Sequence, residues 1–295
     1  MSWIERVSRR RERRAADRAK ERWNGPRTAF VLSGGGVLGA VQVGQLRALI
    51  EAGITPDVVV GTSVGSINGA MIATDPSADA IDKLTEIWTG LRAEDIFPGS
   101  RVARVWNIVA RGDHIHPNDG IRRLIDMLPA HTFESLSLPL HVCAAGLADG
   151  EERWFDSGPL ARAILASTAL PGVYPPVSID GNLYVDGGVV NNIPISRAAA
   201  LGARRIYVLT CGAPNARPRD VRRPIDVLIQ SFAHSRAVRF ELDKERLKNE
   251  AEFVMMPTFD VGAIRYNDPS HSTELIDRAY ELSAQFLAQP GEANA

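Results

Sequence analysis

One serine in this chain has the local sequence that hydrolases use to expose a nucleophile. Ser63 lies between Gly61 and Gly65 in a Gly-x-Ser-x-Gly pattern, directly after a β-branched run. At a strand-to-helix turn this pattern presents the hydroxyl at the start of the helix, and its neighbours must be small because the turn is tight. The preceding apolar run predicts a buried strand, and residues 64–73 predict a helix. Ser63 is therefore a candidate nucleophile.

A glycine-rich loop precedes this serine and has the composition of an anion-binding loop. A predicted strand at residues 28–32 leads into Gly34, Gly35 and Gly36, and Gly39 follows within a predicted helix. Successive glycines let backbone N–H groups turn toward one point, and the helix behind them adds positive partial charge. The loop suits either a bound phosphate or the oxyanion of a tetrahedral acyl intermediate.

The same loop also matches the Gly-x-Gly-x-x-Gly pattern of dinucleotide-binding proteins. Such proteins need an acidic residue at the end of the second strand, about 20 residues further on. Here Asp57 opens the second predicted strand, which ends in Gly-Thr-Ser. The sequence therefore favours acyl transfer over nucleotide binding.

A serine hydroxyl needs a general base before it can attack an ester. The six histidines are expected to be surface or helix-capping residues, although a Ser, Asp, His order could recruit His234 or His271. Asp186 is another candidate, because it closes an apolar strand and Gly187 and Gly188 follow it, where the backbone can pass close to another element. Open α/β sheets place their chemistry at the carboxyl ends of strands. From the residues alone, a plain turn aspartate fits Asp186 equally well.

Strand and helix patterns alternate along the chain, which predicts an α/β fold with three α/β/α layers and a mainly parallel central sheet. Asp-Gly pairs at 149–150 and 180–181 predict hairpin turns. Beyond the serine helix, the predicted helices are 78–91, 120–128, 159–167, 225–248 and 272–288, and the predicted strands are 140–147, 153–155, 177–179, 183–185, 205–211 and 253–256.

No repeat or linker divides the chain into separate units. With 295 residues it can bury a full core. Residues 28–200 contain the motifs and are predicted to be the catalytic domain. Residues 201–295 are expected to add strands and helices that complete the same globular unit. Residues 1–27 are predicted to be a basic N-terminal extension.

Charge and hydrophobicity exclude several classes of protein. The formal net charge of −1 gives no sign of nucleic-acid binding. No apolar stretch is long enough to span a bilayer and no secretory signal is visible, which predicts a cytoplasmic protein. Cys143 and Cys211 lie on apolar, strand-like segments and are expected to be buried thiols. No metal or organic cofactor is predicted.

The N-terminal segment differs from the rest in charge. Residues 1–24 hold nine basic and four acidic residues, a net +5. Such a segment is either a solvated extension or a peripheral anchor on the inner membrane face, in which Trp3, Ile4 and Val7 enter an anionic membrane. A second apolar segment, residues 96–115, either borders an acyl-binding groove or packs into the core.

The three motifs, in this order, resemble those of the patatin-like phospholipase family. The match covers about residues 28 to 200, and two linking stretches at 166–176 and 191–194 also resemble the family. The three motifs are Gly34-Gly35-Gly36-Val37-Leu38-Gly39, Gly61-Thr62-Ser63-Val64-Gly65 and Asp186-Gly187-Gly188.

The resemblance implies a serine lipid acyl hydrolase of the phospholipase A, lysophospholipase or esterase type, acting in lipid degradation. Ser63 would be the nucleophile and Asp186 the proton acceptor, without a catalytic histidine. Backbone amides of Gly34, Gly35 and Gly36 would form the oxyanion hole. The substrate would be a lipid or another fatty ester, and no cofactor is implied.

One position departs from the family pattern. Many members carry Lys or Arg where this chain has Leu38. Backbone amides do not depend on that side chain, so the implied oxyanion hole is kept while any headgroup contact of the basic residue is lost. Two alternatives remain, a His-dependent α/β-hydrolase esterase and a catalytically idle membrane- or protein-binding module of the same fold.

Overall fold

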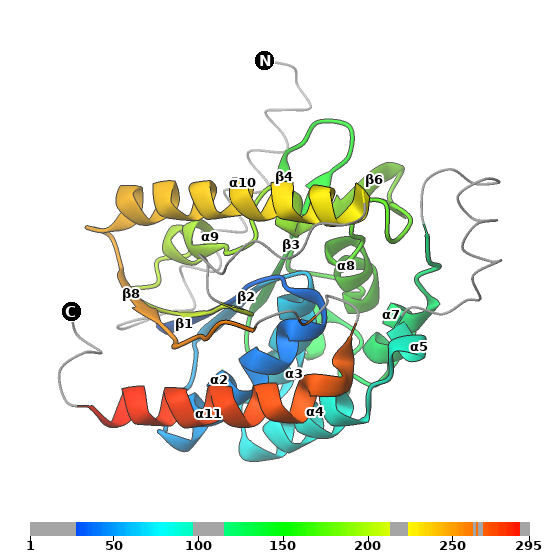
Figure 1. The fold of residues 1–295 in the computed structure, drawn as a ribbon. Helices are drawn as coiled ribbons and strands as arrows, with labels where there is room; N and C mark the ends of the chain where they lie inside the picture. The colour runs from blue at the N-terminus through cyan, green and yellow to red at the C-terminus, as the bar shows by residue number, and fades with distance from the viewer. Residues whose placement is uncertain (1–27, 97–114, 213–223, 262–263, 265–267, 290–295) are drawn as a thin grey trace.

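The computed structural model describes residues 28–96, 115–212, 224–261, 264 and 268–289. In these residues eight strands form one sheet that lies between two layers of helices (Figure 1). The predicted three-layer α/β architecture is therefore confirmed. The N-terminal extension and nearly all of the apolar segment 96–115 lie outside the described residues.

The sheet has the strand order β5-β6-β3-β2-β1-β7-β8, and β4 pairs with β3. β3, β2, β1, β7 and β8 run parallel, whereas β4, β5 and β6 pair antiparallel. The predicted sheet is thus mainly parallel, with an antiparallel part beside β3. The strands are β1 (Thr28–Leu32), β2 (Val58–Thr62), β3 (Leu140–Gly146), β4 (Glu152–Phe155), β5 (Val177–Ile179), β6 (Asn182–Asp186), β7 (Arg205–Leu209) and β8 (Glu252–Met255).

The helices connect these strands and cover both faces of the sheet. The α-helices are α2 (Gly39–Glu51), α3 (Val64–Thr74), α4 (Ala78–Gly90), α5 (Ala93–Ile96), α7 (Asp119–Asp126), α8 (Leu160–Ser167), α9 (Ile195–Ala200), α10 (Pro224–Leu247) and α11 (Ser272–Ala288). Short 3-10 helices are η1 (Gly36–Leu38), η2 (Phe133–Ser135), η3 (Gly187–Val189) and η4 (Pro269–His271).

Alternate residues of the central strands feed two separate cores. On β1, Phe30 and Leu32 pack with residues of α2, α3, α4 and α11, whereas Ala29 and Val31 pack with α9 and with Phe240 of α10. Figure 1 shows α10 and α9 on one side of the sheet and α2, α3, α4 and α11 on the other. Both faces are buried, which explains why these strands have continuous apolar sequences.

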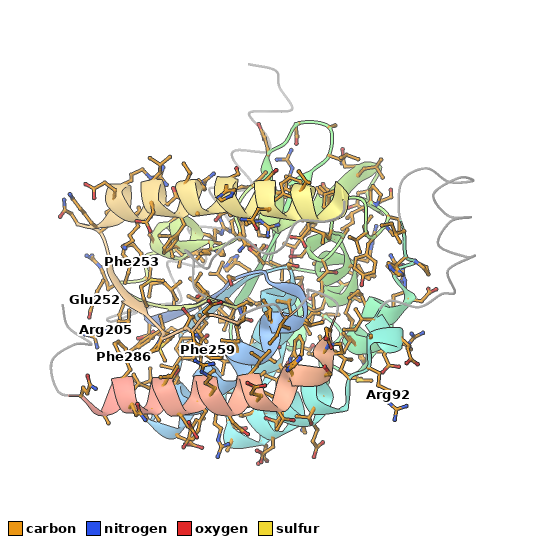
Figure 2. All side chains as sticks on the ribbon, viewed as in Figure 1. Arg92, Arg205, Glu252, Phe253, Phe259 and Phe286 are labelled. Carbon is orange, nitrogen blue, oxygen red and sulfur yellow. The ribbon has the colours of Figure 1, made fainter. Side chains whose placement is uncertain are left out.

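The residues after 200 extend the same sheet. β7 pairs with β1, and β8 pairs with β7. Arg205 Nε donates to Glu252 Oε2 at 2.8 Å across this pair, and Figure 2 shows the two side chains beside each other. Beyond β8, the guanidinium of Arg278 on α11 lies 4.3 Å from the ring centre of buried Phe259. The C-terminal elements therefore pack on the sheet that carries the motifs.

Local predictions agree with the structure at both hairpins. β3 and β4 pair antiparallel around Asp149-Gly150, and β5 and β6 around Asp180-Gly181. Asp180 and Gly181 both have positive φ, 51° and 83°, as a two-residue hairpin turn requires. No sequence pattern predicts α9, because six residues are too few to show a helical period.

β3 brings the carboxyl ends of two distant strands together. β4 pairs with residues 142–145 along one edge of β3. β2 and β6, which pair with the same part of β3, must therefore both lie along its other edge. On that edge, Thr62 of β2 pairs with Cys143 and Asp186 of β6 pairs with Ala144. β2 runs parallel to β3 and β6 runs antiparallel, so their final residues meet head to head.

Two further expectations are tested by the fold. Cys143 and Cys211 are both buried and free, as predicted. Within the ranges that the structure describes, no helix is long and apolar enough to cross a bilayer.

Candidate active site

Ser63 occupies a strained turn between β2 and α3. Its backbone has φ 53° and ψ −126°, a conformation that costs a non-glycine residue about 1–3 kcal/mol. Hydrogen bonds hold it there: the Ser63 N–H donates to Ser167 Oγ at 2.8 Å, and the Ser66 N–H donates to the Ser63 carbonyl at 2.8 Å. This is the geometry that points a side chain out from the start of a helix.

The glycines flanking Ser63 are required by close backbone contacts. A Cβ atom on Gly61 would lie 2.5 Å from the carbonyl oxygen of Gly65. A Cβ atom on Gly65 would overlap the backbone of Leu32 at the end of β1. Any larger residue at either position would push α3 away from the sheet, and Ser63 would move with it.

Asp186 is the hydrogen-bond partner of Ser63. Its carboxylate Oδ2 accepts from Ser63 Oγ at 2.6 Å, across 123 residues of sequence. Its Oδ1 accepts from the Gly188 N–H at 2.7 Å, and Asp186 as a whole residue is only 3% exposed. Asp186 therefore caps the start of η3, as a turn aspartate would, and the same side chain also accepts the hydrogen bond from Ser63.

Burial changes the acidity of Asp186. Removal from water raises the pKa of its carboxyl group above the ordinary value. The nearby Arg236 charge and the hydrogen bonds from Ser63 and Gly188 each lower this pKa and limit the rise. The result is a carboxylate that is more basic than an aspartate in water.

The glycine loop lies directly against Ser63. A Cβ atom on Gly34 would be 3.0 Å from the Ser63 Cβ. The Gly34 N–H, however, donates to the carbonyl of Asn192 at 3.2 Å, which corrects the prediction that this group faces an oxyanion. In the described part of the chain, the N–H groups of Gly35 and Gly36 donate to no backbone oxygen. Gly36 begins η1, where the first N–H groups have no acceptor within the helix.

The remaining motif residues lie around this centre. Gly39 begins α2 and Gly187 begins η3. Leu38 is 7% exposed and belongs to the core, so the side chain at the usual basic position packs with apolar residues. Asp57 precedes β2, and its Oδ2 accepts from the Thr28 N–H at 2.8 Å. Asp57 therefore lies at the opposite end of the sheet from the glycine loop.

Three residues around the site have contacts that the motif patterns did not predict. Ser167 accepts the Ser63 N–H, as described above. Thr62 Oγ1 donates to the Asn191 carbonyl at 2.9 Å, and Asn192 Nδ2 donates to the Gly34 carbonyl at 3.4 Å. Ser167, Asn191 and Asn192 belong to the stretches 166–176 and 191–194. The resemblance marked these stretches, but only the fold shows that they clamp Ser63 and the glycine loop.

Four of the histidines that the structure describes fall into two groups. His234 and His271 are exposed and lie within 3.2 Å of Gln230 and 3.4 Å of Glu274, respectively, in contacts that do not involve Ser63. His116 and His141 are 6% and 4% exposed. The expectation that all histidines are surface or capping residues is therefore wrong for these two.

His141 is the buried member of a second polar cluster, on the α9 side of β3, whose other charged members, Arg197 and Asp156, are partly exposed. Its Nδ1 lies 3.2 Å from Arg197 Nη2 and 3.5 Å from Asp156 Oδ2. Burial, and then the Arg197 charge, lower the pKa of His141 to about 3. The Arg197 guanidinium also lies over the Trp154 ring, 5.3 Å from the ring centre. His141 is therefore a neutral packing residue near neutral pH.

A comparison with models of protein families assigns the chain to a family. The family model for "Patatin-like phospholipase" matches residues 30–199, more than half of the chain. The chain belongs to this family. The matched range contains Ser63, Asp186 and the whole glycine loop.

Individual relatives support the same assignment. The chain is 33% identical over 188 residues to patatin-like phospholipase domain-containing protein 7 of Rattus norvegicus, covering 63% of this chain and 14% of that protein. It is 31% identical over 203 residues to lysophospholipase NTE1 of Coccidioides immitis, covering 66% and 12%. An uncharacterised NTE family protein of Mycobacterium bovis is 32% identical over 202 residues, covering 68% and 53%. The chain thus spans a small part of the first two relatives and about half of the third.

A solved structure with the same fold is VipD from Legionella pneumophila. It superimposes with a TM-score of 0.51 at 16% identity, covering 90% of this chain and 67% of that chain. At this identity the likeness concerns the fold alone.

Proposed function

We propose that this chain is a serine lipid acyl hydrolase that cleaves carboxylic esters of phospholipids or other fatty esters. The observation that carries the proposal is the 2.6 Å hydrogen bond from Ser63 Oγ to Asp186 Oδ2, beside a glycine loop. Relatives named as phospholipases and a lysophospholipase support the lipid substrate class. Residues 28–200 would be the catalytic domain, completed by residues 201–295.

In the first half-reaction Ser63 Oγ attacks the ester carbonyl carbon while Asp186 takes the hydroxyl proton. Negative charge develops on the carbonyl oxygen, where the N–H groups of Gly35 and Gly36 and the N-terminus of α3 would stabilise it. The tetrahedral intermediate collapses by breaking the bond to the alcohol. Asp186 returns its proton to that alcohol, and the acyl group remains esterified to Ser63.

In the second half-reaction a water molecule replaces the alcohol. Asp186 accepts a proton from this water as its oxygen attacks the acyl-serine carbonyl. Collapse of the second tetrahedral intermediate releases the fatty acid, and the proton returns to Ser63 Oγ. Aspartate in water has a pKa of only about 3.9, so the burial of Asp186 is needed to make it a competent base.

A fluorophosphonate probe tests the nucleophile directly, because it phosphonylates an activated serine. We expect the wild type to be labelled and to hydrolyse a fatty ester, and Ser63→Ala to lose both properties. Asp186→Asn should lose turnover with its fold retained by circular dichroism. Ser137→Ala is the matched control, because Ser137 lies on the surface and donates to the Thr74 carbonyl at 2.7 Å. An unlabelled, inactive wild type beside a reactive control hydrolase would support the idle-module alternative.

The His-dependent alternative is tested in the same assay. We expect a His234→Ala, His271→Ala double variant to retain full activity, because the contacts of His234 to Gln230 and of His271 to Glu274 do not involve Ser63. Loss of activity in this variant with an intact fold would contradict a Ser-Asp dyad.

Membrane contact through residues 1–24 is a separate proposal that rests on their +5 charge and on Trp3, Ile4 and Val7. Removing residues 1–24 should weaken sedimentation with anionic vesicles while ester hydrolysis in solution is unchanged. Unchanged sedimentation would contradict the anchor without affecting the proposed reaction.

A further inference from the structure

A cation from outside the three motifs lies beside the proposed dyad. Arg236 is on α10, beyond the residues 30–199 matched by the family model. Its partly buried side chain reaches η3, where its Nε donates to the Gly188 carbonyl at 2.7 Å. The last of the three motifs is therefore attached to a helix that none of them includes.

Gly188 links this arginine to the carboxylate. The Gly188 N–H donates to Asp186 Oδ1 at 2.7 Å, while the Gly188 carbonyl accepts from Arg236. Both backbone groups of one residue are thus fixed, one by each charged side chain. A shift of Arg236 would move Gly188, and with it a hydrogen bond that orients the carboxylate.

The absence of a side chain at Gly188 lets the charges approach each other. A Cβ atom there would lie 2.8 Å from Arg236 Nη2, 2.9 Å from Asp186 Oδ1 and 2.7 Å from Asn192 Oδ1. These three polar atoms therefore surround a single point. Asn192 Oδ1 is buried and has no hydrogen-bond partner in the part of the chain that the structure describes. Arg236 Nη2 therefore lies near both the Asp186 carboxylate and Asn192 Oδ1, without a hydrogen bond to Asn192.

Electrostatics couples the two groups in both directions. Burial raises the pKa of Asp186 and the Arg236 charge lowers it, whereas burial lowers the pKa of Arg236 and the Asp186 charge raises it. The Cys143 thiol of β3 also faces this region, and burial raises its pKa well above the ordinary value, so it stays neutral. Glu152 of β4 and Arg239 of α10 pair with each other at 2.7 Å. Arg236 is therefore the charge that offsets the burial of Asp186.

We propose that Arg236 is a positioning residue for the proposed hydrolysis: its guanidinium holds Asp186 as a carboxylate and fixes Gly188 beneath it. This inference rests on the proposed function, because it needs Asp186 to accept a proton from Ser63. It adds a requirement that the three motifs lack, namely a cation supplied by α10.

The test is the pH dependence of kcat/KM for a p-nitrophenyl fatty ester, measured for the wild type, Arg236→Gln and Arg236→Lys. Without the positive charge, Asp186 should bind its proton at higher pH. The acid limb should therefore move up by about 1–3 pH units in Arg236→Gln, with kcat lowered at neutral pH and KM little changed. Raising the pH should restore part of the lost kcat. Arg236→Lys keeps the charge and should show a smaller shift.

Arg239→Gln is the matched control from one turn further along the same helix. It loses the contacts of Arg239 to Glu152 and Asp243, at 2.7 Å each, but has no bond to Gly188. Its acid limb should remain where it is in the wild type. If Arg236→Gln fails to fold, Arg236→Lys still tests the proposal. Lysine cannot donate to Gly188 and approach Asp186 at the same time, so its acid limb should move up by a smaller amount. An unmoved acid limb in Arg236→Lys would contradict the proposal.

Three outcomes would overturn the inference. An unmoved acid limb, with activity lowered equally at every pH, would reduce Arg236 to a structural residue. Loss confined to phospholipid substrates, with the p-nitrophenyl ester unaffected, would make Arg236 a contact for the phosphate headgroup. A wild type with no Ser63-dependent turnover would refute the proposed function itself, whereas turnover with an unmoved limb would refute only the role of Arg236.

Discussion

Two polar clusters beside β3 contain similar groups but differ in what they contact. Opposite Ala144 of β3, Asp186 of β6 lies near Arg236 and accepts from Ser63. Two residues before Cys143, His141 lies beside Arg197 and Asp156. The second cluster has the histidine and carboxylate expected of a hydrolase, and the first has no histidine.

The difference lies in what each cluster faces. The carboxylate of Asp186 meets a hydroxyl that a strained turn holds at the carboxyl end of β2. The ring of His141 meets a guanidinium, whose charge helps to lower the pKa of His141 to about 3. A histidine near an aspartate is therefore not enough to identify a catalytic pair. The proposed Ser-Asp dyad depends instead on the backbone, which places Ser63 and N–H donors around Asp186.

The largest contrast is expected from the same substitution in each cluster. Asp186→Asn should lower kcat by about 10²–10⁴-fold, because the proposed general base is lost. Asp156→Asn should leave kcat within about threefold of the wild type, because Asp156 contacts His141 and Arg197 rather than Ser63. Steady-state hydrolysis of a fatty ester measures both. Equal losses in the two variants would mean that the clusters are coupled.

A smaller loss is expected from a change in the glycine loop. In Gly34→Ala the new Cβ would lie 2.5 Å from Asn192 Oδ1 and 3.0 Å from the Ser63 Cβ, so the loop must shift. Because small displacements of reacting groups are costly, kcat should fall by about 10–10²-fold. Gly90→Ala is the control, because nothing lies within 4 Å of a Cβ there. Full activity in Gly34→Ala would place the oxyanion donors elsewhere.

The smallest expected effect is on the free energy of unfolding at acidic pH, and it involves the His141 cluster. His141 has a folded pKa of about 3, below its unfolded value of about 6.5, so the unfolded chain binds the proton first as the pH falls. The stability from this group is complete above about pH 6.5 and should decline by about 1.4 kcal/mol per pH unit down to about pH 3. Urea unfolding of the wild type and His141→Asn at pH 7 and pH 5 measures this. The variant should lose less stability between the two pH values; an equal loss would contradict the assignment.

Much of the fold was predictable because local rules and the tertiary structure agree. Continuous apolar runs predicted the parallel strands, and Asp180-Gly181 predicted a hairpin whose turn residues have positive φ. The helix α10 was predicted at 225–248 and lies at Pro224–Leu247. Short α9 was not predicted, because packing of Ile195 and Ala198 on the sheet stabilises it more than any periodic pattern indicates.

The sequence by itself determined the chemistry that is available: a serine between two glycines, a glycine-rich loop, and an aspartate at a strand end. It could not determine which distant groups meet, because that depends on strand register. Only the tertiary structure paired Thr62 and Asp186 with neighbouring residues of β3. It also directed the Gly34 N–H to the Asn192 carbonyl and brought Arg236 of α10 to Gly188. Burial, which changes the basicity of Asp186, is likewise a property of the packed molecule.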